Sequence, residues 1–68
     1  MKLSIKRINR LIHEEKPKAI ARYIAKFLPE DKRSLAEVRL DEYGHKLVKG
    51  EKLVSKPSVM KKIEELSK

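Results

Sequence analysis

The sequence predicts a small α+β fold over residues 1–68, a single domain with two N-terminal helices, a β-hairpin or short meander, and a C-terminal helix. Apolar residues recur at helical spacing near both ends of the chain. Between these regions, apolar and polar residues alternate and a glycine-containing turn signal follows. A length of 68 residues with 40% apolar content fits one compact core.

The first helix is expected at residues 4–15, with Ser4 as its N-cap. Its apolar positions share one face, and they are Ile5, Ile8, Leu11 and Ile12. Pro17 then ends this helix and begins another, because the residue before a proline resists the α conformation and proline suits a first helical turn.

The second helix is expected at residues 17–28 and ends before Pro29. It carries a wide apolar face, made of Ala19, Ile20, Tyr23, Ile24, Phe27 and Leu28. The width of this face predicts contact with more than one neighbouring element. Residues 29–34 then read as a polar connector.

Residues 34–54 allow two interpretations. In the favoured hairpin, Val38 and Leu40 alternate with charged residues, Gly44 lies in the turn, and Gly50 allows a bulge before a third short strand at Lys52–Val54. In the alternative, Ser34 begins a short helix through a capping box, and Gly44 closes it. A last helix is expected at residues 57–67, opened by Pro57.

The absence of cysteine excludes disulfides and thiolate metal sites, and it fits a reducing cytoplasm. No apolar run approaches the ~18 residues of a membrane span. The start of the chain is interrupted by charge in a way that does not resemble a signal peptide. We therefore expect a cytoplasmic protein with no membrane association.

Positive charge is concentrated in the first part of the chain. The net charge is +8, and residues 1–28 hold eight Lys or Arg against two acids, which gives +6. Residues four apart lie ~6 Å apart along a helix axis, which suits contact with successive phosphates. The candidate nucleic-acid-binding residues are Lys6, Arg7, Arg10, Lys18, Arg22 and Lys26. The competing interpretation is a solvated face that keeps a small protein soluble.

Catalysis and metal binding are not expected. His13 and His45 are too few and too far apart for a zinc site, and the serines lie where helix caps are needed. No glycine-rich loop is present to hold a nucleotide phosphate. We therefore expect no catalytic residue, no metal and no cofactor.

The expected function is that of a small regulatory or accessory protein that binds nucleic acid, duplex above all, through phosphate with weak sequence preference. Asn9 is the one Asn of the chain and there is no Gln, so few side chains suit base readout. Two helices followed by a hairpin outline a winged helix-turn-helix, although the turn lacks the usual small residue. The alternative is a protein-interaction module, either a homodimer or an inhibitor or adaptor of a larger acidic protein.

Overall fold

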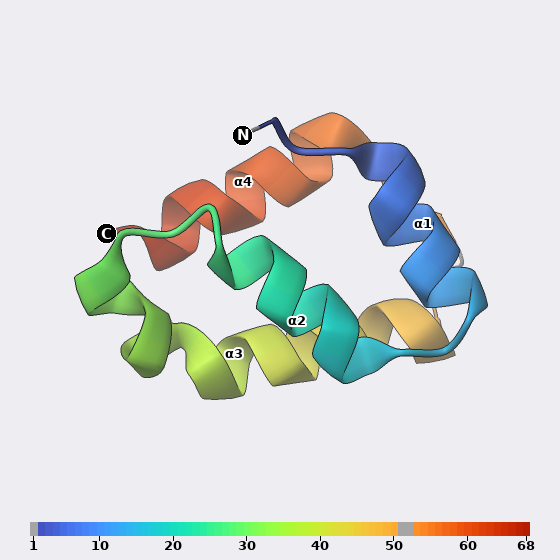
Figure 1. Ribbon diagram of the computed structural model, residues 1–68, viewed down its shortest axis with the longest axis horizontal. Helices are drawn as coiled ribbons and strands as arrows, with labels where there is room; N and C mark the ends of the chain where they lie inside the picture. Colours follow the sequence, from blue (N-terminus) through green and yellow to red (C-terminus); the bar gives the residue numbers. More distant parts are fainter. Residues whose placement is uncertain (1, 51–52) are drawn as a thin grey trace.

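Four α-helices make up the fold of residues 2–50 and 53–68, the part of the chain that the computed structural model describes. The helices are α1 (Ile5–His13), α2 (Pro17–Ala25), α3 (Glu30–Lys49) and α4 (Lys56–Leu66). Figure 1 shows α2 beside α3, α1 at one end of this pair, and α4 running from the side of α1 toward the start of α3. The helices expected at residues 4–15, 17–28 and 57–67 are thus present, the first two with shorter bounds and the last shifted by one residue.

The predicted α+β fold is wrong, because the described residues contain helices and no strand. Residues 30–49, which hold most of the predicted hairpin, form the single 20-residue helix α3. The apparent alternation was misleading, since Leu40 is buried while Val38 is 67% exposed. Residues 51–52, where the predicted third strand begins, lie outside the described residues. Without a hairpin there is no wing, so a winged helix-turn-helix is wrong as well.

The interpretation of residues 34–44 as a short helix was also incomplete. Helix α3 begins four residues before Ser34, directly after Pro29. Its first turn carries Glu30 and Asp31 and its last turn carries Lys46 and Lys49, so both ends complement the helix dipole. The helix therefore has end signals of its own, and those at its start lie before the segment that either interpretation considered.

Gly44 lies inside α3, where the backbone of that helix meets the start of α2. A Cβ atom at this position would lie 2.5 Å from the carbonyl oxygen of Pro17. Glycine costs a helix about 1 kcal/mol relative to alanine, but here it allows two backbones to approach more closely than any side chain would permit. The glycine expected to form a turn or to end a helix is instead a packing residue.

The core lies between the helices and is aliphatic apart from Tyr23 in the described residues. Its fully buried side chains come from all four helices, and they are Ile8, Ile12, Ile20, Ile24, Leu40, Leu47 and Val59. Because α1 and α2 turn their isoleucines inward, their basic residues are left on the outside.

A Schellman turn joins α1 to α2 and sets the direction in which the chain leaves α1. The N–H of Glu15 donates to the carbonyl of Ile12 at 3.0 Å, and that of Lys16 donates to the carbonyl of Leu11 at 3.0 Å. Glu15 occupies the left-handed position of this turn with φ of 55°, where glycine is the usual residue. A strained residue therefore lies between the two most basic helices.

Two polar side chains join separate elements of the fold. The guanidinium of Arg33 on α3 donates to the carbonyls of Ala25 at 3.0 Å, Leu28 at 3.2 Å and Lys26 at 3.4 Å, so it caps the carbonyl end of α2. The amide of Asn9 accepts a hydrogen bond from the N–H of Val54 at 2.9 Å and donates to its carbonyl at 3.5 Å. This second contact ties the segment before α4 to α1.

Substitution of Gly44 by alanine should destabilise the fold, although it raises helix propensity. We expect Gly44→Ala to lower the free energy of unfolding by about 1–3 kcal/mol, because the added methyl group overpacks the contact with Pro17. Urea denaturation measures this change. Gly50→Ala is the matched control, since a Cβ there would lie 3.4 Å from its nearest neighbour, the carbonyl of Lys46. Equal stability of the two variants would contradict the packing role.

Relief of the strained turn should stabilise the protein. We expect Glu15→Gly to raise the free energy of unfolding by about 0.5–1 kcal/mol, because glycine adopts a positive φ without steric cost. Thermal denaturation should then show a melting temperature higher by a few degrees. Glu15→Ala removes the same charge but keeps a side chain at positive φ, so it should give no such gain. A larger gain for alanine than for glycine would rule out backbone strain.

Candidate nucleic-acid interface

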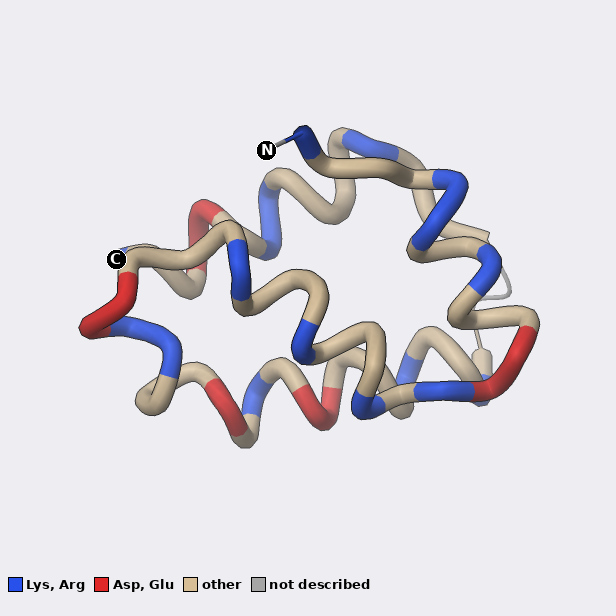
Figure 2. Tube along the Cα trace, in the orientation of Figure 1, with Lys and Arg blue, Asp and Glu red and all other residues tan. Residues whose placement is uncertain are grey.

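The six basic residues that the sequence indicated are all exposed. Helices α1 and α2 contain no acidic residue, and Figure 2 shows basic positions along both of them, with acidic positions on α3, α4 and the connecting segments. Lys6, Arg7 and Arg10 lie on α1, Lys18 and Arg22 lie on α2, and Lys26 caps the end of α2. The two helices therefore present cations without intervening carboxylates of their own.

None of the six cations forms an ion pair within the described residues. The two ion pairs found there join Lys16 to Glu14 at 3.3 Å and Lys62 to Glu65 at 3.9 Å. Charges that lack a carboxylate neighbour keep their full interaction with an incoming anion, and they repel one another until such an anion arrives. This arrangement favours a polyanionic partner.

The three cations of α1 line one shallow hollow together with Ser4, Leu11 and Glu14. The guanidinium carbon of Arg7 lies 5.2 Å from the centre of the Tyr23 ring, so it stacks on a residue of α2. The Tyr23 hydroxyl accepts the N–H of Ser4 at 2.8 Å, and the Ser4 hydroxyl accepts the N–H of Arg7 at 3.3 Å. These contacts orient Arg7 and fasten the start of α1 to α2.

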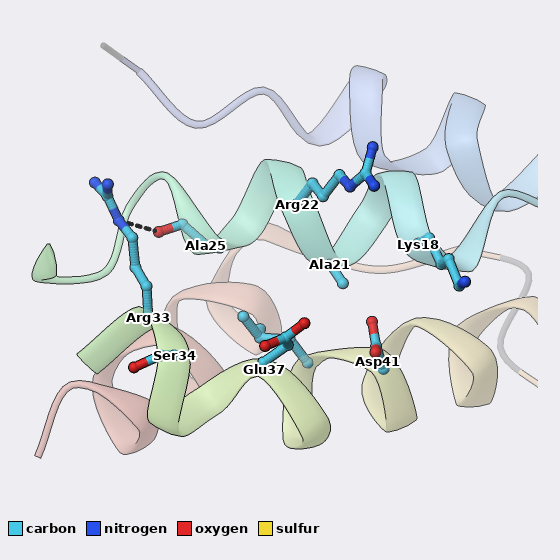
Figure 3. Close-up of a pocket in the computed structure, with 9 residues that line it drawn as sticks. Lys18, Ala21, Arg22, Ala25, Arg33, Ser34, Glu37 and Asp41 are labelled. Carbon is cyan, nitrogen blue, oxygen red and sulfur yellow. Dashed lines mark hydrogen bonds between the residues drawn. The ribbon is translucent and has the colours of Figure 1, made fainter. Parts of the chain in front are cut away.

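The cations of α2 line a different hollow, a groove of about 400 Å³ between α2 and α3. Lys18 and Arg22 line it from α2, while Glu37 and Asp41 line it from α3, as Figure 3 shows. In that view the two carboxylates point toward α2 and the Arg22 guanidinium extends away from α3. The positive surface is therefore bordered by acids on the α3 side.

The structure thus divides the six candidates into two groups. Lys6, Arg7 and Arg10 share the hollow on α1, and Lys18 and Arg22 share the groove beside α3. The side chain of Lys26 is exposed and lines neither hollow. Arg7 of α1 contacts Tyr23 of α2, so the hollow on α1 adjoins the second basic helix.

No sequence pattern indicated the other charged residues of the groove. Arg33 was expected in a connector, and Glu37 was expected on a strand. The spacing of Glu37 and Asp41 is a usable signal, because residues four apart share one face once α3 is known to be a helix. Only the packing of α2 against α3 shows that this face lies opposite Lys18 and Arg22.

The residues considered for base readout and for metal binding do not have the surroundings that those roles require. The Asn9 amide is occupied by the backbone of Val54, so it is not presented for base readout. His13 and His45 are exposed, and the described residues contain no group of three or more side chains placed to hold a metal ion. Within the same residues, no helix is both long enough and apolar enough to cross a membrane.

Comparison with known proteins gives no match to a family model, to a curated protein or to a solved structure.

Proposed function

We propose that this chain is a small, non-catalytic nucleic-acid-binding protein that contacts the phosphates of a duplex. The observation that carries the proposal is that two adjacent helices contain exposed cations and no acid, and that none of these cations pairs with a carboxylate among the described residues. Phosphate contact requires no particular base, so one such surface can bind many sequences. The occupied amide of Asn9 supports weak sequence preference, because it removes the one Asn that could read a base edge.

The geometry also supports different roles for different cations in phosphate binding. Arg7 is held by Tyr23 and packs against the body of the protein, so it would provide a preorganised phosphate contact. Arg22 and Lys26 are exposed and pair with no carboxylate in the described residues. These two residues can therefore be replaced without loss of packing, which makes them the suitable positions at which to test binding.

Salt dependence tests the electrostatic contact. If about five phosphates of a duplex are engaged, the logarithm of the binding constant should fall with the logarithm of salt concentration at a slope of about −4 to −5. Fluorescence anisotropy with a labelled random duplex measures this slope. The double variant Arg22→Ala/Lys26→Ala should reduce its magnitude by about 2, equally for unrelated sequences, because two counterion-releasing contacts are lost.

The matched control replaces two cations elsewhere on the molecule. Lys49 and Lys61 are exposed and lie on α3 and α4, so Lys49→Ala/Lys61→Ala makes the same change in net charge. The control should bind more tightly than the Arg22→Ala/Lys26→Ala variant and keep the slope of the unmodified protein. Equal loss in both variants would show that net charge alone, without the proposed surface, accounts for binding.

Protein association is a second candidate function, and one observation favours it. Leu35 and Val38 lie one turn apart on the outer face of α3 and are 76% and 67% exposed. Two large apolar side chains in this position could contact a second copy or another protein. The patch is small compared with a standard interface of about 800 Å² per partner, so we rank this function behind nucleic-acid binding.

Light scattering with and without a random duplex separates the two functions. For a nucleic-acid-binding protein we expect a monomer alone and a complex with duplex at low salt, because phosphate contact drives association. A dimer that persists at high salt and ignores duplex would favour protein association. Leu35→Ser/Val38→Ser should then convert that dimer to a monomer, whereas it should leave duplex binding unchanged.

A further inference from the structure

The groove between α2 and α3 is lined by cations on α2 and by two carboxylates and one cation, Arg33, on α3. The guanidinium of Arg33 is engaged by backbone carbonyls at the end of α2, which leaves the carboxylates as the available charges of the α3 wall. Lys18 and Arg22 stand one turn apart on α2, and Glu37 and Asp41 stand one turn apart on α3. None of these four side chains pairs with an opposite charge within 4.0 Å in the described residues. The walls are therefore too far apart to neutralise each other directly, and both keep their capacity to bind a ligand between them.

The floor of the groove is small and apolar. Ala21 and Ala25 of α2 and Leu40 of α3 line it, and the open groove has a volume of about 400 Å³. Ala21 and Leu40 are buried, with exposed fractions of 6% and 2%. Alanines at this floor leave room for a flat group of modest size, whereas a duplex is too wide to enter a space between two helices in contact.

A single nucleotide matches both walls. Its phosphate is an anion that Lys18 and Arg22 can bind. Its base carries N–H groups that can donate hydrogen bonds to carboxylates. We propose that this groove binds one unpaired nucleotide, with its phosphate at the α2 wall and the edge of its base at Glu37 and Asp41. The inference rests on the proposed function and adds to it a site for an unpaired base beside the phosphate-binding helices.

Guanine is the base that fits this wall best. Its Watson–Crick edge offers two neighbouring donors, N1–H and the N2 amino group, which one carboxylate can accept together. Thymine offers one donor on that edge and two carbonyl oxygens that the carboxylates would repel. No aromatic side chain lines the groove, so stacking adds little and the choice of base depends on hydrogen bonds.

The carboxylates also determine the orientation of the bound nucleotide. They repel phosphate, so the sugar–phosphate chain is directed to the α2 rim, from which the Arg22 guanidinium extends away from α3. Neighbouring phosphates of the strand then continue toward the cations of α1. One bound base can therefore be added without removing the phosphate contacts that the proposed function requires.

Labelled ten-nucleotide deoxyribonucleotides test this site. One probe is oligothymidine, a second has one central guanine, and a third has inosine in place of that guanine, which removes only the N2 amino group. At fixed low salt, the protein should bind the guanine probe at least about fivefold more tightly than either of the others, the lower end of the discrimination that a good bidentate contact gives. Equal affinity for all three probes would overturn the inference while leaving the proposed function in place.

A variant locates the preference in the groove. Glu37→Gln/Asp41→Asn should abolish the difference between the guanine and inosine probes. The same variant should strengthen binding to oligothymidine, because two charges that repel its carbonyl oxygens and phosphates are removed. Glu42→Gln/Glu64→Gln makes the same charge change at exposed positions that do not line the groove, and it should keep the preference for guanine. A preference that survives in the groove variant would overturn the assignment. Absence of binding to every probe and to duplex would instead remove the proposed function itself.

Discussion

The contact between Gly44 of α3 and the carbonyl of Pro17 at the start of α2 is the constraint on which the rest of the structure depends. Two backbones meet where a Cβ atom would lie 2.5 Å from a carbonyl oxygen, so α3 can lie against α2 only because residue 44 has no side chain. Leu40 and Leu47, one turn to either side on α3, are then buried. The same contact sets the separation of the helices and with it the width of the groove they enclose.

The position of α1 follows from α2 through a few specific contacts. The Schellman turn at Glu15 sets the direction of the chain, and Tyr23 binds both Ser4 and Arg7. Because isoleucines of α1 and α2 enter one core, their basic residues must face outward. The exposure of the cations is thus a consequence of how the apolar faces pack, and no separate interaction is needed to explain it.

The positive surface has an energetic cost in the absence of a partner. The six cations form no ion pair in the described part of the chain, which carries an excess of positive charge, and the net charge of the whole sequence is +8. A small domain has little stability to spare, so a polyanion that relieves the repulsion among like charges would stabilise the folded state as it binds. Glu37 and Asp41 limit the positive surface on the α3 side, so under the proposed function they would restrict where a strand can lie.

The sequence by itself determined the properties that depend on neighbouring residues. Pro17, Pro29 and Pro57 mark helix boundaries, the apolar periodicity of α1, α2 and α4 is complete within each helix, and the excess of cations near the N-terminus is a matter of composition. Only the tertiary structure decided that residues 30–49 are one helix. Gly44 resembles a turn residue in its local sequence, and the reason for a glycine there is its contact with the backbone of Pro17, 27 residues earlier in the chain. The sequence also did not show that Glu37 lies across a groove from the cations of α2. That arrangement depends on which helices pack together, and the local spacing of residues does not indicate it.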